Sequence, residues 1–365
     1  METKISTNVN QFPSLTWHHL HINHGHLDAS VTGVLELKPS APLPQEITIS
    51  EFSPKERTGE ALELTTQLGA DMDSLIDRAL LETGSKTKRL TVKKGSNSPA
   101  VKFEIDIEDG TQAVQDIEIL AEEDSVSSFI FSLSQKQNAK KEGFVCLRIR
   151  VLASERANVG IYTVNCLGKN TQVALGLATK CNDQACVELT QVELSAKNIF
   201  TGSRNVLAGY KASCLERSAW CANGTDSIDI NYIARHEGRQ TESNGTFSGV
   251  LSGSAKKAWR GTIEFPKGCV DASGEEQEDV LLLSPTVDNK SMPVILCDEE
   301  AVEGKHGSSI GKLSPDTLLY LQSRGIDEKT ASAMLTKSKI NAVARFIPDE
   351  DVKEKIRLFL EEQFA

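Results

Sequence analysis

Strict alternation of apolar and polar residues marks the middle of the chain. Residues 101–107 read Val-Lys-Phe-Glu-Ile-Asp-Ile, and a period of two is what a half-buried β-strand produces. Similar short runs recur up to residue 298, most of them separated by the turn formers Gly, Asn, Asp or Ser. No helical pattern separates these runs, which excludes a doubly wound α/β sheet. Residues 88–300 are therefore predicted to form an all-β core.

Alternation alone leaves three architectures open for this core: a sandwich, a barrel or a β-solenoid. The aromatic content is low, at 5%, whereas Ala, Ser, Asn and Thr are frequent. Small residues favour the solenoid, because its narrow interior stacks small side chains. The sequence shows no strict repeat period, so the residues themselves establish only a mainly β fold.

The first part of the chain, residues 1–87, has a mixed pattern. Short alternating segments are followed by a helical pattern over residues 71–83, where Met72, Ile76 and Leu80 recur at the spacing of an amphipathic helix. We expect a small α/β region here.

The last part, residues 301–365, is predicted to be a C-terminal helical domain. Ser314–Pro315 has the form of a helix N-cap followed by a proline in the first turn. Gly325 fits the end of that helix, and Asp327 fits the start of the next. A final helix follows the acidic residues 349–351, and its apolar stripe must pack either on the β core or on a partner.

The charge and hydropathy of the chain argue against nucleic-acid and membrane partners. The 365 residues include 40 Lys and Arg against 51 Asp and Glu, a formal net charge of −11. Nucleic-acid binding requires a basic surface that displaces counterions from phosphates, so no nucleic-acid partner is expected. No apolar run approaches the roughly 20 residues that span a bilayer, so no membrane partner is expected either. The polar start lacks the apolar core of a secretory signal, and the expected location is cytoplasmic.

The familiar sequence signatures of catalysis are missing or out of context. The chain has no GxxxxGK[ST] loop for nucleotide phosphates and no HExxH zinc motif. Its eight cysteines form no CxxC pair, so the sequence contains no short-range cysteine motif for a closed zinc or iron–sulfur site. Residues 307–311 match GxSxG, but a hydrolase elbow needs a strand running into the serine and a helix leaving it, so we interpret the match as chance.

Five histidines crowd one segment, from His18 to His26. Alternation would put His19 and His21 on one face of a strand, where they could bind zinc or nickel. No carboxylate or cysteine completes a defined ligand set, so an exposed polar strand and turn is favoured. The role of the segment stays open.

Two other residues are candidates for a functional role because of their position in the chain. His306 lies at the predicted seam between the last β run and the first C-terminal helix, and Cys297 closes the apolar run 294–296. Local physics favours structural roles for both, because a histidine near a turn and a cysteine ending a strand are usually structural. The seam itself is the reason to keep them, since loops at the ends of a scaffold often carry function.

Four runs of sequence carry a resemblance to a known family. They are Ile-Asn-Tyr-Ile-Ala-Arg-His-Glu-Gly at 230–238, Trp-Arg-Gly-Thr-Ile at 259–263, Glu-Glu-Gln-Glu-Asp-Val-Leu-Leu-Leu-Ser at 275–284, and His-Gly-Ser-Ser-Ile-Gly-Lys-Leu at 306–313 continuing through 319–326. They resemble the SufB/SufD family, the scaffold subunits of the SUF iron–sulfur cluster assembly system.

The resemblance implies a fold and a set of partners. The family core is a right-handed parallel β-helix with an N-terminal region and a C-terminal helical domain, which would settle the choice among β architectures. Members pair SufB with SufD through their β-helices and bind the ABC-type ATPase SufC through the C-terminal region. The expected SufC-binding residues here are Leu318, Leu319, Tyr320, Arg324 and Ile326.

Two positions imply the SufD type. SufB-like chains carry a cysteine where this chain has Glu278, and a glutamate where it has Gly307. His306 matches the SufD histidine implicated at the SufB interface, where the nascent cluster is thought to form, so it is the candidate transient metal ligand, with Cys297 second. No tightly bound cofactor is expected, only a transient iron–sulfur cluster at that interface. Homodimer or heterodimer stays open.

The leading hypothesis is therefore a non-enzymatic SufD-like scaffold. The alternative is an enzyme that acts on a polysaccharide, as many β-solenoids do. Such enzymes usually show clustered carboxylates or a Ca²⁺ site, whereas the acidic residues 271–279 are interpreted here as a solvated turn.

Overall fold

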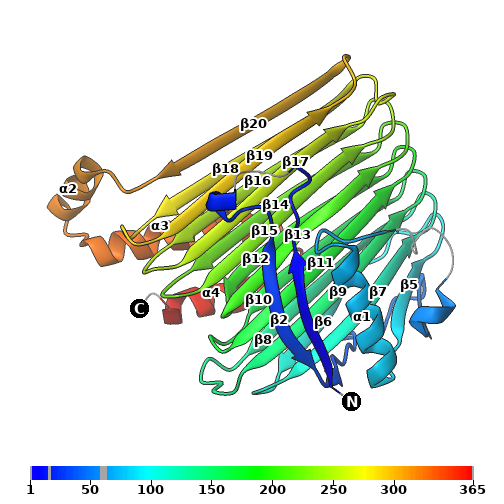
Figure 1. The fold of residues 1–365 in the computed structure, drawn as a ribbon, viewed down its shortest axis with the longest axis horizontal. Coiled ribbons are helices and arrows are strands. Elements are labelled where there is room, and N and C mark those ends of the chain that lie inside the picture. The colour runs from blue at the N-terminus through cyan, green and yellow to red at the C-terminus, as the bar shows by residue number, and fades with distance from the viewer. Residues whose placement is uncertain (1, 15–17, 58–63, 364–365) are drawn as a thin grey trace.

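The computed structural model describes residues 2–14, 18–57 and 64–363. Its core is a parallel β-solenoid of about eight turns, in which successive strands alternate between two sheets (Figure 1). The solenoid predicted for the core is confirmed. The strands of the eight-stranded sheet are β6 (Val101–Ile107), β8 (Val126–Gln135), β10 (Asn158–Cys166), β12 (Cys186–Ser195), β14 (Ser213–Ala222), β16 (Glu242–Leu251), β18 (Ala272–Leu282) and β20 (Val302–Gly311).

The second sheet has ten strands. All are parallel except the first, β4, which pairs antiparallel with β5, and the short strand β3 (Gly33–Val34) adds beside β7. Besides β3, its nine strands are β4 (Ile47–Phe52), β5 (Thr87–Val92), β7 (Gln112–Ala121), β9 (Gly143–Ala153), β11 (Thr171–Cys181), β13 (Asn198–Leu207), β15 (Ser227–His236), β17 (Lys256–Phe265) and β19 (Asp288–Cys297).

Alternate residues of each strand fill the interior between the sheets. In β6, Val101, Phe103, Ile105 and Ile107 are buried and the residues between them are more exposed, as the alternation predicted. Larger side chains fit where glycine leaves room. The side chain of Trp220 is fully buried, and a Cβ on Gly249 would lie 2.0 Å from its indole ring.

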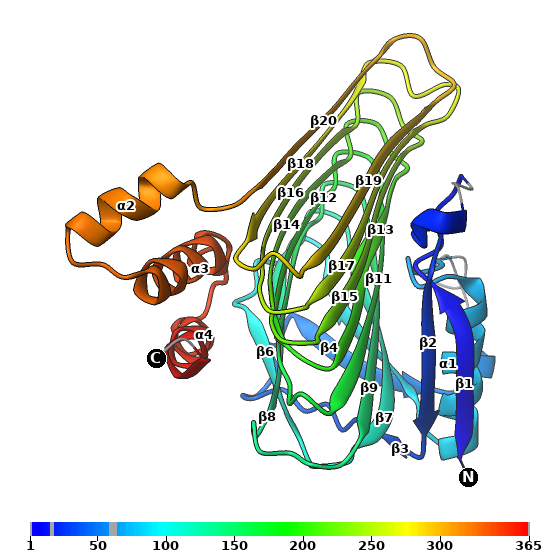
Figure 2. The same cartoon turned by 60° about the vertical axis from the view of Figure 1, so that its left-hand side comes forward.

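The N-terminal region covers the outer face of the ten-stranded sheet. β1 (Thr3–Val9) pairs antiparallel with β2 (Gly25–Val31), and helix α1 (Ala70–Thr83) packs beside them (Figure 2). The helix predicted for this segment is confirmed, and it ends at Gly84 in the left-handed conformation. A short 3-10 helix, η2 (Pro54–Glu56), follows β4.

The C-terminal helices lie on the opposite side of the solenoid, along the eight-stranded sheet (Figure 2). They are α2 (Pro315–Ser323), α3 (Glu328–Ala344) and α4 (Glu350–Gln363). The apolar residues of α3 and α4 bury themselves against the outer face of that sheet, so the final stripe packs on the β core. α2 has no buried residue and extends away from the rest of the chain.

Two sequence-based expectations differ from the structure. Residues 302–311 were assigned to the helical domain, but they form β20, the last strand of the eight-stranded sheet, so the solenoid continues past the predicted boundary at residue 300. The histidine-rich segment is not a strand around His19 and His21: His18–Leu20 form a 3-10 helix, η1, and His21 has a positive φ of 49°. No helix of the described residues is long and apolar enough to cross a membrane.

Candidate functional site

The solenoid is open at its last turn. β19 is paired only with β17, and β20 only with β18, so one edge of each strand has no partner strand among the described residues. Every residue of β20 after Val302 is exposed, including Ile310, whose exposed fraction is 45%. An unpaired edge and an uncovered inner face are the features by which a solenoid end pairs with another chain, unless a cap covers them.

His306 lies on the inner side of this open turn. A Cβ on Gly304 would lie 3.1 Å from the Ile295 side chain, and the Ser308 hydroxyl donates a hydrogen bond of 3.2 Å to the interior carboxylate of Glu278. Gly304 and Ser308, which lie two residues before and two residues after His306, thus both face the interior. Side chains alternate along a strand, so His306 shares that inner face.

Cys297 ends the other strand of the same turn. Its thiol is exposed and donates to the backbone carbonyl of Glu299 over 3.0 Å. A cavity of about 590 Å³ opens beside it, lined also by Ile295 and by Gly304 of β20. The two candidates predicted from the sequence, His306 and Cys297, are therefore carried by the last two strands at one end of the solenoid.

A buried ion pair lies directly beneath this turn. The Lys257 ammonium group contacts the Glu278 carboxylate, and both side chains are fully buried. Lys257 also donates to the hydroxyl of Ser291 on β19 over 2.9 Å. Burial lowers the pKa of Lys257 to about 8, while Glu278 acts in the opposite direction. Glu278, the position that distinguished the SufD type, is thus an ion-pairing residue of the interior.

Glu276 is buried in the same layer, without such a partner. Both of its carboxylate oxygens are shielded from solvent and lack a hydrogen-bond partner among the described residues. Burial, followed by the nearby carboxylates of Glu216 and Glu278, raises its pKa well above the ordinary value. In β18, Glu276 forms a register pair with His306 of β20.

The interpretation of residues 271–279 as a solvated turn was therefore wrong. Within β18 the burial alternates, with Glu275 and Gln277 exposed and Glu276 and Glu278 buried. The sequence did contain a signal for the inward carboxylates. Glu276 and Glu278 lie four and two residues before the apolar, buried Val280, so alternation along a strand places all three side chains on the same face.

The residues predicted to bind the ATPase lie on or just after α2. The exposed fraction of Leu319 is 67% and that of Tyr320 is 59%, and the Arg324 guanidinium lies over the Tyr320 ring at 5.4 Å. Leu318 and Ile326 are half-buried. The helix begins as predicted, with the Ser314 hydroxyl accepting from the backbone N–H of Thr317.

The geometry supports neither a hydrolase nucleophile elbow nor a complete metal site within the described residues. The GxSxG match of residues 307–311 lies at the end of β20 rather than in a strand-to-helix elbow. Among the residues that the structure describes, no group of three or more His, Cys, Asp or Glu side chains is arranged to hold a metal ion. Any metal ion bound at the open end would need further ligands from water or from another chain.

Comparison with known proteins gives a consistent picture. Residues 103–339 match the family model described as SUF system FeS cluster assembly, SufBD core domain. The chain is 31% identical over 121 residues to the iron-sulfur cluster assembly protein SufD of Bacillus subtilis, covering 33% of this chain and 28% of that protein. It is 24% identical over 168 residues to the chloroplastic SufBD family protein ABCI8 of Arabidopsis thaliana, covering 46% and 30%.

A longer match is to the SufBD family protein ycf24 of Trieres chinensis, 23% identical over 250 residues, covering 66% of this chain and 51% of that protein. The chain thus matches less than a third of the length of the first two relatives and about half of the third.

Proposed function

Since this chain belongs to the SufB/SufD family of iron–sulfur cluster assembly proteins, we propose that it is a SufD-like scaffold subunit of a SUF assembly complex. It pairs with a SufB-like paralogue through the solenoid and with a SufC-like ABC ATPase through the C-terminal helices. The chain acts by presenting surfaces and ligands rather than by catalysing a reaction. Iron and sulfide are the cargo of the complex.

The observation that carries this proposal is the open last turn. Among the residues that the structure describes, no strand pairs with the outer edges of β19 and β20, and the inner residues Ile295 and Ile310 are only partly covered. A partner solenoid that continues the two sheets would satisfy both the hydrogen-bonding groups and the apolar surface. Pairing there encloses His306 and Cys297 between the two chains, so these residues are the proposed contributors to cluster assembly.

The ATPase-binding surface is proposed on α2. A helix that buries none of its residues yet carries Leu319 and Tyr320 gains little stability from its own chain. Docking into a groove of a partner would bury these two side chains. Such a partner supplies the nucleotide chemistry, for which this sequence has no phosphate-binding loop.

A homodimer of the isolated chain is the second form that this open turn supports, because two copies could join by the same edges. A polysaccharide-cleaving solenoid is disfavoured by the family match and by the inward direction of the carboxylates in β18. The proposed compartment is the cytoplasm, with a plastid as the alternative, since one relative is named as chloroplastic.

Co-expression tests the proposal. The chain is produced with a SufB-like and a SufC-like chain, and the complex is purified through a tag on the SufB-like chain. All three chains are expected to elute together in size-exclusion chromatography. The matched control replaces Ile310 by Lys on the open edge, which should release this chain from the SufB-like one. Elution of the wild-type chain alone, with no partner retained, would contradict the proposal.

A further inference from the structure

Three of the four buried glutamates that point into the solenoid from β12, β14 and β18 have a hydrogen-bond donor among the described residues. The Glu193 carboxylate accepts from Asn165 at 2.9 Å, and that of Glu216 accepts from Gln191 at 3.0 Å. Glu278 has its ion pair with Lys257. Glu276 has neither a donor nor an ion-pair partner in the part of the chain that the structure describes, although its exposed fraction is only 1%. A buried polar group without a partner needs a physical explanation, and a cation or water that the group binds is one of the few available.

The surroundings of Glu276 leave space for its carboxylate. A Cβ on Gly261 of β17 would lie 2.3 Å from the carboxylate oxygen Oε2, so only glycine permits this position of the side chain. On β16 the register partner of Glu276 is also a glycine, Gly245. The site is therefore built by small neighbours in two strands, and the next residue along the solenoid axis is His306 of β20.

The register places the two side chains on one face at neighbouring positions. Paired residues of adjacent strands are about 4.8 Å apart at their backbones, a separation that two side chains can close around one ion. His306 faces inward because Gly304 and Ser308 do. Carboxylate oxygen and imidazole nitrogen are donors that Fe²⁺ and related divalent metals accept, with bonds of about 2.0–2.2 Å for Zn²⁺.

We propose that Glu276 and His306 form a two-ligand half-site for a divalent metal ion, ferrous iron in the working complex, at the open end of the solenoid. Water or a partner chain completes the coordination. The inference rests on the proposed scaffold role for the identity of the metal, but the half-site belongs to this chain alone and is testable without any partner.

Co²⁺ is the probe, because its visible absorption reports the ligand set and it does not oxidise as Fe²⁺ does. The full chain without an affinity tag is titrated with Co²⁺ and followed by absorbance and calorimetry. Glu276→Gln and His306→Ala should each weaken binding by about tenfold or more, as loss of groups that hold a metal does. The matched control, Glu275→Gln, alters the exposed neighbour of Glu276 on the same strand and should bind as the wild type does.

The histidine-rich segment needs its own control. A variant with His19, His21, His24 and His26 replaced by Ala should keep the part of Co²⁺ binding that depends on Glu276. Loss of all binding in that variant would overturn the proposal, because the metal would then sit at the N-terminal segment. Wild-type affinity in either Glu276→Gln or His306→Ala would overturn it as well.

Thermal unfolding gives a second readout. Saturating Co²⁺ should raise the melting temperature of the wild type, because the metal binds the folded state, and should raise that of Glu276→Gln by less. If Glu276→Gln unfolds, His306→Ala decides the test, since His306 is exposed on the last strand. A half-site that fails these tests leaves the scaffold role intact, whereas failure to co-elute with partners contradicts the scaffold role and not the half-site.

Discussion

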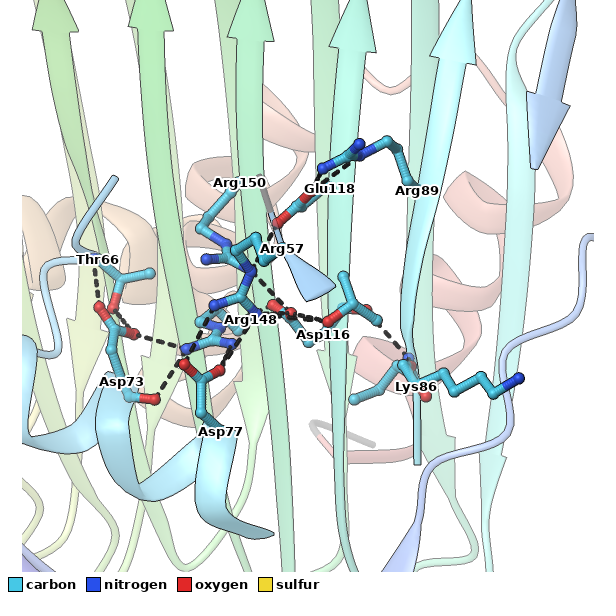
Figure 3. A network of polar contacts seen from close by, with 12 residues as sticks. Arg57, Thr66, Asp73, Asp77, Lys86, Arg89, Asp116, Glu118, Arg148 and Arg150 are labelled. Carbon is cyan, nitrogen blue, oxygen red and sulfur yellow. Dashed lines mark hydrogen bonds and ion pairs between the residues drawn. The ribbon is translucent and has the colours of Figure 1, made fainter. Parts of the chain in front are cut away.

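Arg148 of β9 and Asp116 of β7 form a buried ion pair beneath helix α1, with Arg148 Nε 2.7 Å from Asp116 Oδ1 (Figure 3). The Arg148 guanidinium also contacts Asp77 of α1, while Asp116 additionally accepts from Arg57 at 2.8 Å. The pair thus joins the outer face of the solenoid to the helix and to the loop before it.

The charges of this network cancel. Its guanidinium groups are those of Arg57, Arg89, Arg148 and Arg150, and its carboxylates are those of Asp73, Asp77, Asp116 and Glu118. A balanced network tolerates burial, whereas removal of one member leaves an opposite charge uncompensated in a medium of low dielectric constant. The network therefore fixes how the N-terminal region sits on the solenoid.

Asp116→Asn should accordingly destabilise the fold by about 3–5 kcal/mol. Urea denaturation at pH 7 measures the change in the free energy of unfolding. The control is Glu51→Gln, which removes an exposed pair with Lys88 in the same region and should cost less than about 1 kcal/mol. Equal losses in the free energy of unfolding would show that the buried network stabilises the fold no more than an exposed ion pair does.

The same network predicts acid sensitivity. Burial alone would raise the pKa of Asp116, but the adjacent Arg148 and Arg150 lower it below its ordinary value. A depressed carboxyl pKa in the folded state contributes stability above the unfolded pKa of about 3.9, and this contribution is lost as the pH falls below it.

A second set of interior carboxylates has the opposite dependence on pH. Burial raises the pKa of both Glu193 and Glu216 to about 7, against the hydrogen bonds they accept. The folded state then holds a proton on each between about pH 4.3, the unfolded pKa, and pH 7. Their effect on stability is most favourable below this window and weakens as the pH rises through it.

Glu216→Gln should therefore reduce the loss of stability between pH 5 and pH 7, by up to about 1.4 kcal/mol per pH unit. Urea denaturation at several pH values measures the slope for the variant and the wild type. Glu242→Gln, at an exposed position of β16, is the matched control and should keep the wild-type slope. An unchanged slope in Glu216→Gln would mean that the carboxyl is ionised throughout.

Local signals in the sequence predicted most elements correctly. The spacing of Met72, Ile76 and Leu80 predicted α1, and the cap residues Ser314 and Asp327 predicted where α2 and α3 begin. These signals succeed because caps and periodic apolar faces are properties of a few neighbouring residues.

β20 was missed for a physical reason. The alternation of apolar and polar residues reflects which face of a strand is covered, and no further turn formed by the described residues lies above the inner face of β20. Residues 302–311 are consequently Gly- and Ser-rich, with Ile310 as the sole large apolar residue after Val302. The site could be predicted only as a pair of residues, His306 and Cys297, and not with Glu276, because register between turns is set by packing of the whole solenoid.

The apolar surface of α2 gives a prediction that separates docking from stability. Leu319→Glu should abolish binding of the SufC-like ATPase, because a charge would be placed in the apolar contact, and should leave the melting temperature unchanged, because α2 buries no residue. Calorimetry or pull-down measures the binding. Leu358→Glu on α4, where the exposed fraction is 52%, is the matched control and should retain the ATPase. Equal binding by Leu319→Glu and the wild type would place the ATPase elsewhere.

His306 is the residue on which cluster assembly by the complex should depend most. His306→Ala removes an exposed imidazole from the inner face of the last strand, so the fold, the pairing with the SufB-like chain and the binding of the ATPase should all persist. Cluster formation on the reconstituted complex, followed by absorbance and by iron and sulfide content, should fall at least about tenfold, as for loss of a metal-holding group. Cys297→Ser should have a smaller effect, because the thiol lies at the end of β19 and donates to a backbone carbonyl.

Lys305→Ala is the control, since Lys305 is adjacent on β20 but pairs with Glu303 on the outward side of the strand. It should assemble clusters at the wild-type rate. Wild-type assembly by His306→Ala would remove His306 from the site. Unfolding of His306→Ala, seen as loss of the cooperative thermal transition, would instead assign His306 a structural role, because the fold of the isolated chain would then depend on contacts of the imidazole.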